Sequence, residues 1–537
     1  MKNFLLPVIL FCASLCCTAL EIDPAKAVIV APGSEKLAAG ELQKHLKLIT
    51  GVEIPIQGKA DGQFAFTLGN PPSDAGLQPE EARWKVSRDG VHIYGGPRNG
   101  TAFAVYDFLE KQFKVRWIEP GDRGISYPEM KMLKLEETSG HWTPGRLAQR
   151  RIRHELFPYN GYPYDMPGQF IIANRGYNSN LPKEMHLTKQ EYDAKLKEIR
   201  MWHLRMRMGS GLSLNYGHAF TNWKKYGKTH PEYFSLINGK RGPKNAGMPD
   251  TVKMCVSNPE LHKQIVEEWR KRNMPKCINI CENDWGGYCE CPECRKLDMP
   301  PAPGAKWDDD LSDRYVYFAN KVLELASRHR PDVIATAYAY GVYKNAPRRE
   351  KVSPQLVLGF VPSKFDLPGA EANYRAWAAA GAKQLFLRPN DHHAISIGLP
   401  TGGEKQLFKA FKLGFKYGIT GTDYDNFWPA VGIADFILAR AHTHPEDTFE
   451  QHEQEYYAGF GKAAEEVGEY YRYWRQNVWD NRIYPDRKEI AKLGLYGNYQ
   501  RGLMWNIHRY FRLSDFDKTD AILARAAAKQ LSGQDRR

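Results

Sequence analysis

Short apolar runs alternate with helical segments through the centre of this chain, and that alternation limits its fold more than any other feature. The eight runs lie at residues 152–157, 205–208, 252–256, 277–281, 333–337, 356–361, 384–387 and 418–422. Apolar residues at helical spacing lie between them, over 188–203, 259–272, 314–330, 370–380, 404–416 and 432–441. Continuous apolar strands alternating with helices are typical of a parallel sheet covered on both faces. Residues 141–445 are therefore predicted to form the (β/α)8 TIM barrel of an α/β protein.

An open doubly wound sheet is the main competing fold. Such sheets that bind nucleotides carry a glycine-rich phosphate loop directly after a strand. The glycine-rich stretch at 95–100 reads better as a turn, and no other strand is followed by such a loop. The pattern thus favours the barrel.

Two further regions flank the predicted barrel. Residues 20–140 are predicted to form a small α/β sandwich domain: a strand at 28–30, a helix at 34–51, strands at 53–56 and 64–68, a hairpin at 84–94 and a helix at 101–113. Residues 446–537 are helical in pattern and rich in tyrosine. They are predicted to be a helical region packed on the barrel.

The first nineteen residues predict export. Lys2 precedes an apolar run over 4–17, and small residues at 17–19 offer a signal-peptidase site. The run is too short to span a membrane, so residues 1–19 are interpreted as a signal peptide. The protein is expected to be periplasmic or extracellular, which disfavours nucleic acid as a partner and requires no membrane.

Charge and aromatic content narrow the expected ligand. The formal net charge of +13 falls to +12 once Lys2 is removed, and the chain carries 13 Trp, 29 Tyr and 24 Phe. Aromatic side chains are the usual means of stacking flat rings, and a positive surplus suits an anionic polymer. With export, these properties favour an oligosaccharide or polysaccharide substrate, with acidic groups as one possibility.

If the barrel is correct, catalysis belongs at the carboxyl ends of its strands. Glu282 and Asp284 follow the fourth strand, and Asp423 and Asp425 the eighth. In each pair the two side chains are expected on one side of an extended chain. Two carboxyls that flank a glycosidic bond, one protonating the leaving oxygen and the other stabilising positive charge, are the usual requirement for glycoside hydrolysis. The alternative is that these acids cap helices or pair with nearby Arg and Lys.

Polar and aromatic residues after the second, fourth, fifth, seventh and eighth predicted strands are the candidates for substrate binding. They are His218, Trp285, Tyr338, Tyr340, Arg388, Asp391, His392 and Trp428. Their structural alternative is ordinary packing and hydrogen bonding at the rim of a barrel.

Four cysteines are expected to have a structural role. Cys289, Cys291 and Cys294 form a tight run, and Cys255 lies on the neighbouring predicted strand. In a zinc site the fourth thiolate would be Cys255 or Cys281. Disulfide bonds and a structural zinc ion both fit them, and no histidine accompanies the run to suggest catalysis. No cofactor and no catalytic metal are predicted.

The N-terminal region resembles a known non-catalytic domain. The stretch Gly-Val-His-Ile-Tyr-Gly-Gly at 90–96, Asn-Gly-Thr-Ala at 99–102, Phe-Leu-Glu at 108–110 and Val-Arg-Trp at 115–117 carry the likeness. They are similar to the α/β domain shared by α-glucuronidases and β-hexosaminidases.

The centre resembles the DUF4838 family, which includes glycoside hydrolase family 163. The matching stretches are His-Pro-Glu-Tyr-Phe at 230–234, Asn-Gly-Lys-Arg at 238–241, Cys-Val-Ser-Asn-Pro-Glu at 255–260, Asn-Asp at 283–284, the cysteine run at 289–294, Ser-Asp-Arg-Tyr at 312–315 and Ala-Tyr-Ala-Tyr at 337–340.

The resemblance implies a secreted barrel glycosidase, with endo-β-N-acetylglucosaminidase action on complex N-glycans and retention at the anomeric carbon. Asp284 matches the acid of the family's fourth strand. After Gly-Ile-Thr-Gly at 418–421 the family pattern has a Glu, whereas this chain has Thr422-Asp423-Tyr424-Asp425. A carbohydrate-binding barrel without catalysis and an α-glucuronidase-type hydrolase remain the alternatives. The glycan, its linkage, endo or exo action, and which carboxyl is the acid stay open.

Overall fold

The computed structural model describes residues 19–154, 188–210, 214, 216–243, 252–284, 286–362, 365–389, 400–427, 432–494 and 499–532. The chain divides into two compact units. One comprises residues up to Arg116 together with 126–143, and the other comprises 117–125 and the chain from Pro144 onward.

The N-terminal unit is built on a mixed sheet of six strands in the order β10-β5-β6-β4-β2-β3. The strands are β2 (Ala27–Val30), β3 (Ile56–Gln57), β4 (Phe64–Leu68), β5 (Ala82–Ser87), β6 (Gly90–Gly95) and β10 (Ser139–Trp142). Strands β5 and β6 form the predicted hairpin, and β2, β4 and β6 are parallel. The strand predicted at 53–56 appears instead as β3, because only Ile56 and Gln57 reach β2.

Two helices pack in this unit, α1 (Lys36–Thr50) and α2 (Gly100–Phe113). Helix α1 buries an apolar face that includes Leu42, Leu46 and Ile49. It ends at Gly51, whose φ of 77° allows its N–H to reach the Lys47 carbonyl, a termination that favours glycine. A two-stranded sheet of β1 (Leu20–Ile22) and β9 (Leu133–Leu135) completes the unit.

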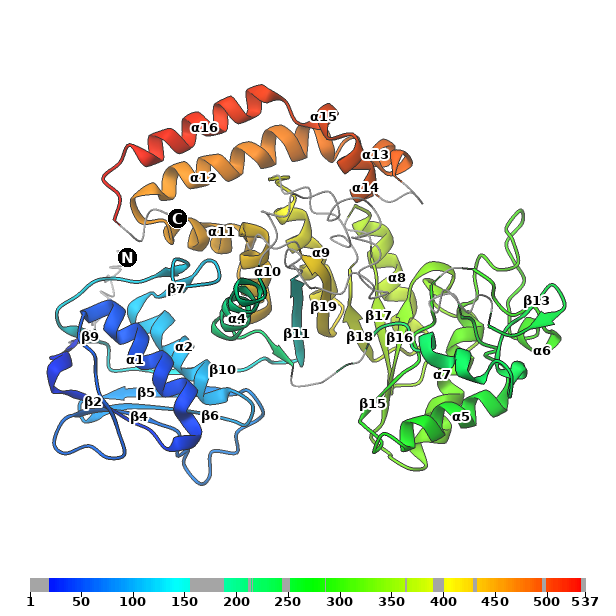
Figure 1. Ribbon diagram of the computed structural model, residues 1–537, viewed down its shortest axis with the longest axis horizontal. Coiled ribbons are helices and arrows are strands. Elements are labelled where there is room, and N and C mark those ends of the chain that lie inside the picture. The colour runs from blue at the N-terminus through cyan, green and yellow to red at the C-terminus, as the bar shows by residue number, and fades with distance from the viewer. Residues whose placement is uncertain are drawn as a thin grey trace, which may run out of the picture. The chain divides into compact units, whose positions relative to one another are not determined.

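The larger unit contains a curved sheet of seven strands in the order β12-β11-β19-β18-β17-β16-β15 (Figure 1). They are β11 (Gln149–His154), β12 (Gly209–Ser210), β15 (Cys277–Asn279), β16 (Ile334–Ala339), β17 (Leu356–Phe360), β18 (Gln384–Leu387) and β19 (Ile419–Phe427). All neighbours from β11 to β15 pair in parallel. The first predicted strand thus lies beside the eighth, and the fourth to eighth follow in order across the sheet. This is the order of a TIM barrel.

The second and third predicted strands are wrong as parallel strands. Helix α4 (Lys189–Arg205) extends into the second, and Arg207 has a φ of 52° that turns the chain before β12, which pairs antiparallel with β11. In the third, Met254 makes an isolated antiparallel bridge to Phe234. The apolar residues of both segments are buried, but they do not join the parallel sheet.

The segment around Tyr216 lies between β11 and β15, where the described sheet is open. The Leu214 N–H donates to Gln149 Oε1 (3.2 Å), and the Ala219 N–H donates to the Cys281 carbonyl (3.0 Å). The Tyr216 ring stacks on Phe386 and Tyr338, with centroids 4.8 and 5.6 Å away.

A glycine makes room for this aromatic packing. A Cβ at Gly359 would lie 2.7 Å from the Tyr216 ring, so a larger residue at that position of β17 would displace the stack. The interior of the sheet is therefore filled by side chains, as in other small barrels.

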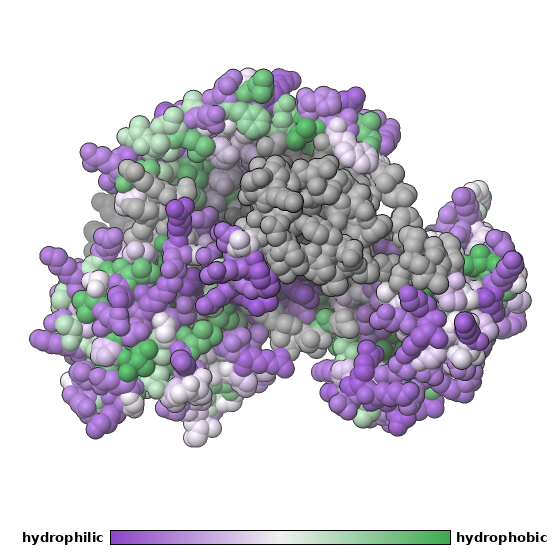
Figure 2. Space-filling model, viewed as in Figure 1, coloured by the Kyte–Doolittle hydropathy of each residue, from purple (hydrophilic) through white to green (hydrophobic). Residues whose placement is uncertain are grey.

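Helices cover the outside of the sheet. They are α5 (Pro259–Arg270), α7 (Ser312–Ser327), α8 (Leu367–Ala379), α9 (Glu404–Lys416) and α10 (Ile433–Thr443) (Figure 1). Helix α7 follows β15, α8 follows β17, α9 follows β18 and α10 follows β19, whereas β16 leads to β17 through a 3-10 turn (Gly341–Tyr343). Figure 2 shows mainly hydrophilic side chains over α5 and α7, as expected for helices with one buried face.

The region after Pro445 is helical, as the sequence predicts. It contains α11 (Phe449–Ala458), α12 (Ala464–Tyr473), a π-helical segment (Trp474–Ile483), α13 (Arg487–Leu493), α14 (Tyr499–Trp505), α15 (Ile507–Tyr510) and α16 (Leu513–Ala527). Trp474, Trp479 and Tyr499 belong to its own apolar core, against which Phe365 packs. Many aromatics of the tail are therefore used for packing. Among the described residues, no helix is long and apolar enough to cross a membrane.

Candidate functional site

Two clusters of polar and charged residues involve the parallel strands, one just after the carboxyl end of β15 and the other within the paired strands β11 and β19. One, the β15 corner, comprises Glu282, Asn283 and Asp284 with His218. The other, the β19 cluster, comprises Asp423 with Arg151 and Arg153 from β11. They contain three of the four predicted catalytic acids.

In the β15 corner the two acids differ sharply in exposure, although the sequence places them two residues apart. The Asp284 side chain is 53% exposed, whereas Glu282 is buried at 4%. Strand β15 ends at Asn279, so the extended alternation that would put both side chains on one side does not continue. Asp284 is therefore the acid of this corner that solvent, and a substrate, can reach.

His218 is held beside Asp284. Its Nε2 lies 3.5 Å from Asp284 Oδ2, and its Nδ1 lies 3.4 Å from the Glu282 carbonyl. The buried side chain of Asn283 fixes the loop that carries this histidine, because its Oδ1 accepts from the Phe220 N–H (3.2 Å). A histidine that contacts a carboxylate can orient it and tune its proton affinity.

Glu282 is a buried acceptor. Its Oε2 accepts from the Tyr315 hydroxyl of α7 (2.9 Å), and its Oε1 accepts from the Asn283 N–H (2.9 Å). Burial, and secondarily the nearby charge of Glu282, raise the pKa of Tyr315 well above its ordinary value. Tyr315 thus keeps its proton and remains a donor to Glu282.

A buried lysine and further tyrosines surround this corner. Lys253 donates from Nζ to the Asn283 carbonyl and lies 4.7 Å from the centre of the Tyr288 ring. Tyr343 packs on Tyr315 with ring centroids 4.7 Å apart. Burial raises the pKa of Tyr288, with Glu282 a secondary cause.

In the β19 cluster the carboxylate is buried and paired. Asp423 is 1% exposed and accepts from both Nε and Nη2 of Arg153, with the Nε–Oδ1 distance at 2.8 Å. Arg151 Nε lies 3.7 Å from Asp423 Oδ1, and its side chain is 52% exposed. The register aligns Arg151 with Asp423, and Arg153 follows two residues later on the same face. Two cations thus face one carboxylate, and the group carries a net positive charge.

The remaining described candidates also lie at strand ends. Arg388, directly after β18, sits with its guanidinium carbon 5.2 Å from the centre of the Tyr338 ring. Tyr338 belongs to the interior stack, whereas Tyr340, just after β16, is 40% exposed. Tyr340 is the more accessible of the two tyrosines to a ligand.

Four of the predicted binding residues, Trp285, Asp391, His392 and Trp428, lie outside the described residues. Asp425 is described as backbone of β19, and its side chain lies outside the description.

Sequence reasoning missed several residues of these clusters. Arg151 immediately precedes the first predicted strand and Arg153 lies near its start. Their two-residue spacing, which places both side chains on one face of a strand, was the available signal. Lys253 lies in a segment predicted as a strand. Tyr288 and Tyr315 carry no signal by themselves, because only the packing of α7 brings Tyr315 to Glu282.

The four structural cysteines are brought together. Cys255, Cys289, Cys291 and Cys294 are buried, and their Sγ atoms all lie within 4.8 Å of one another. The six cysteines of the described residues are free thiols.

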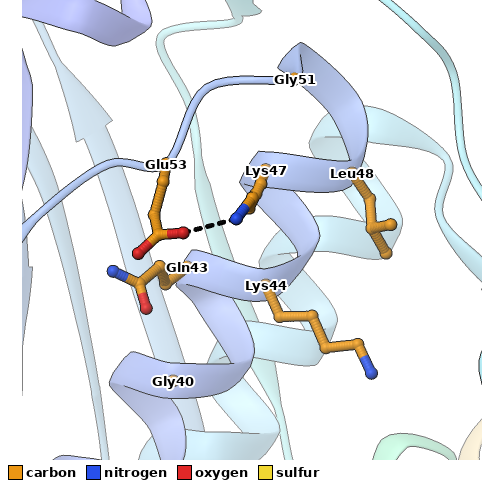
Figure 3. A pocket seen from close by; sticks show the side chains of 7 residues that line it. All are labelled: Gly40, Gln43, Lys44, Lys47, Leu48, Gly51 and Glu53. Carbon is orange, nitrogen blue, oxygen red and sulfur yellow. Dashed lines mark hydrogen bonds and ion pairs between the residues drawn. The ribbon is translucent and has the colours of Figure 1, made fainter.

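A separate hollow of about 450 Å³ lies along α1 in the N-terminal unit (Figure 3). Lys47 and Glu53 form an ion pair there, with Nζ and Oε2 2.5 Å apart. Its lining is Gly40, Gln43, Lys44, Lys47, Leu48, Gly51 and Glu53. None of the predicted catalytic or binding residues contributes to it.

Residues 121–384 match the family model described as "Domain of unknown function (DUF4838)". The resemblance to DUF4838 is therefore confirmed for this part of the chain, which contains the β15 corner and the four cysteines. No curated protein matches the chain.

Several solved structures align with most of the chain at low identity. A Streptomyces plicatus N-acetyl-β-hexosaminidase in complex with Thio-NAglucal is 12% identical, with a TM-score of 0.41, over 82% of this chain and 91% of its own. A family 20 β-N-acetylhexosaminidase from Streptomyces coelicolor is 12% identical, with a TM-score of 0.41, over 84% and 93%. Flavobacterium johnsoniae chitobiase is 12% identical, with a TM-score of 0.43, over 88% and 73%.

Proposed function

We propose that this chain is an exported glycoside hydrolase that cleaves a glycosidic bond in a complex or acidic glycan. The observation that carries the proposal is the β15 corner: Asp284 is an accessible carboxylate at a strand end of a barrel-type sheet, with His218 beside it. Carboxyl ends of barrel strands are where TIM-barrel enzymes place their catalytic groups. The match to DUF4838 over this region supports the proposal through the resemblance read from the sequence, to a family that includes glycoside hydrolases.

In this proposal Asp284 is the general acid. It gives its proton to the glycosidic oxygen as the bond from that oxygen to the anomeric carbon breaks, and the bonding electrons leave with the oxygen. His218 orients the carboxyl. The exposed Tyr340 supplies an aromatic face near the same strand ends for a sugar ring.

The nucleophile is assigned to the substrate. Asp423 is engaged by Arg153 and lies close to Arg151, so it is poorly available to attack an anomeric carbon. In substrate-assisted hydrolysis the oxygen of a 2-acetamido group attacks instead, and a protein carboxylate only orients that group. Water, deprotonated by the Asp284 carboxylate, then attacks the anomeric carbon and breaks the bond to the acetamido oxygen, which restores that group. Two inversions give retention, and the scheme fits an endo-β-N-acetylglucosaminidase acting on N-glycans.

The positive surplus of the β19 cluster favours a substrate that carries carboxylate or sulfate groups. Arg151 presents a half-exposed guanidinium there, and guanidinium groups bind such anions in a bidentate manner. Sialylated N-glycans and uronic-acid polymers both have this chemistry. The α-glucuronidase-type alternative is tested in the same experiment by including uronic-acid substrates.

A carbohydrate-binding barrel without catalysis is the second candidate function. The specific observation that favours it is that Asp423, one of the two acids expected to act, is buried in an ion pair. A barrel can keep its fold and ligand binding after its catalytic pair is lost.

The test compares three proteins on sialylated and neutral N-glycoproteins and on uronic-acid polysaccharides: wild type, Asp284→Asn and Asp332→Asn. Asp332 precedes β16 at the opposite end of the sheet and pairs with Arg330 on the surface, so it is a matched control for the same chemical change. Released glycans are identified by mass spectrometry, and binding is measured by calorimetry.

Cleavage by wild type and Asp332→Asn with a loss in Asp284→Asn supports the proposal. Binding without cleavage by all three proteins identifies the non-catalytic barrel. Equal cleavage by all three removes Asp284 from the chemistry. Export is tested by expressing the full chain in a bacterium and reading the mature N-terminus; a chain that keeps residues 1–19 contradicts it.

A further inference from the structure

The four buried cysteines form a geometry that the proposed hydrolysis does not use. Cys255 comes from the segment that bridges to Phe234, and Cys289, Cys291 and Cys294 come from the chain after the β15 corner and from the short helix α6 (Pro292–Arg295). The Sγ of Cys255 lies 3.6 Å from that of Cys291 and 3.9 Å from that of Cys294. Each of the four residues is at most 4% exposed.

These separations are those of ligands around a tetrahedral metal ion. A zinc–sulfur bond of about 2.3 Å in tetrahedral geometry places the sulfur atoms roughly 3.8 Å from one another. A disulfide bond needs sulfur atoms about 2.05 Å apart. We propose that Cys255, Cys289, Cys291 and Cys294 bind one zinc ion as a structural tetrathiolate site.

The surroundings suit thiolate ligands. The Leu236 N–H donates to Cys289 Sγ at 3.3 Å, and the Ser257 hydroxyl lies 3.1 Å from Cys294 Sγ. The guanidinium of Arg241 interacts with Cys255 and also donates to the Phe234 carbonyl (2.8 Å). Four thiolates and one zinc ion carry a net charge of −2, and hydrogen-bond donors and a cation around such a site lower the cost of burying it.

The site would join three segments that are distant in sequence. The hairpin of β13 (Leu236–Ile237) and β14 (Lys240–Arg241) contacts the cysteine run, where the Glu290 N–H donates to the Leu236 carbonyl (2.9 Å). Arg314 of α7 donates to the Cys289 carbonyl (2.9 Å). The metal would link both elements to the Cys255 segment.

This linkage has a consequence for the β15 corner. The chain from the end of β15 to Cys289 carries Asp284 and is anchored at one end by the strand and at the other by the cysteine group. A metal at Cys289 therefore fixes the second end of this loop. The zinc ion would act by positioning Asp284 and would not touch the substrate.

The first measurement determines which chemistry the cysteines have. The full chain is purified without chelators, its metals are quantified by plasma mass spectrometry, and its thiols are titrated after denaturation with and without a chelator. We expect about one zinc ion per chain and, once the metal is removed, six reactive thiols in a chain that has lost residues 1–19 or nine in a chain that keeps them. Absence of zinc with two or four thiols missing, and their masses joined in pairs, would replace the site by disulfide bonds. Iron in place of zinc would overturn the identity of the metal.

Variants then assign the ligands. Cys294→Ser is expected to lower bound zinc at least tenfold, whereas Cys277→Ser, a cysteine of β15 outside the group, is expected to keep about one ion per chain. Cys294→His is the second variant in case the serine change prevents folding. It should retain the metal, and after cobalt substitution its visible spectrum should differ from that of the wild-type tetrathiolate. Unchanged zinc content in Cys294→Ser, or identical cobalt spectra, would contradict the assignment.

Discussion

The β15 corner and the β19 cluster share one sequence pattern, an acid just after a predicted parallel strand, yet the two acids have different surroundings in the structure. Asp284 is half exposed beside a histidine, whereas Asp423 is buried and accepts two hydrogen bonds from one arginine. The difference comes from β11, which places Arg151 and Arg153 opposite Asp423 and has no counterpart beside Asp284 among the described residues. The position of an acid at a strand end therefore does not define its role; its partners do.

The largest effect is expected from Asp284→Asn. If Asp284 supplies the proton, turnover should fall by about 10²- to 10⁴-fold, the usual contribution of general acid–base catalysis. The free energy of unfolding should change by less than about 0.5 kcal/mol, because the side chain is exposed. Initial rates and denaturant unfolding measure the two quantities. An equal fall in Asp332→Asn would show that the loss is not specific to this corner.

Asp423→Asn should have the opposite profile. The change leaves Arg153 without its bidentate acceptor, and losing a hydrogen-bonded charge of this kind costs about 1–3 kcal/mol of unfolding free energy. Chemical denaturation of Asp423→Asn, Arg153→Gln and the double variant tests this. The double variant should be less destabilised than the sum of the single changes. If Asp423→Asn abolishes turnover at unchanged stability, the two acids have the same kind of role after all.

A third buried carboxylate, Glu404, has the opposite balance of charges from Asp423. Asp423 faces two arginines, whereas Glu404 shares a single arginine with a second glutamate. Glu404 at the start of α9 and Glu453 of α11 share one arginine, Arg475, at 3.1 and 2.5 Å. Burial raises the pKa of Glu404 to about 7, although Arg475 acts against the shift. Because the folded pKa lies above the unfolded one, this group contributes its stability fully below about pH 4.5, and the contribution is lost as the pH rises through about 7.

Each pKa unit corresponds to about 1.4 kcal/mol, so the loss amounts to a few kcal/mol at most. Glu404→Gln should flatten the decline of unfolding free energy between pH 5 and pH 8, and urea unfolding at several pH values measures it. An unchanged slope in Glu404→Gln would assign the decline to other groups.

The smallest effect is expected from Arg151→Gln. The ion pair between Arg153 and Asp423 remains in this variant. The free energy of unfolding should therefore change by less than about 1 kcal/mol, as is usual for an exposed ion pair such as that of Arg151. The KM for sialylated or uronic-acid substrates should rise several-fold, and the KM for neutral glycans should not change. A rise for neutral glycans as well would show that Arg151 does not select charge.

The sequence predicted those parts of the fold in which burial and strand pairing coincide. The runs at 333–337, 356–361, 384–387 and 418–422 are both apolar and paired, and they became β16 to β19. At 205–208 and 252–256 the apolar residues are buried, but these segments do not pair in a parallel ladder. An apolar run in the sequence indicates burial and does not indicate strand pairing. Periodicity cannot separate these two cases.

The candidate site likewise contains residues that the sequence predicted and contacts that it could not predict. The rule for strand ends located Asp284 and Asp423, because it depends only on strand order. The ion pair of Asp423 could not be foreseen, since Arg153 is 270 residues away in sequence. The cysteines were easier, because three of them are neighbours in the chain and the fourth is on the adjacent segment.

The separation between β11 and β19 also determines how the molecule can assemble. The strands from β15 to β19 follow one another along the chain, whereas β11 pairs with β19, whose contacting residues lie 270 positions downstream. The entropy of closing a loop grows with its length, and pairing between distant segments slows folding. We therefore expect the sheet to grow from β15 toward β19 and to receive β11 last. Until then the unpaired edge of β11 is exposed to aggregation, so a chain truncated before Ile419 should misfold rather than form a smaller domain.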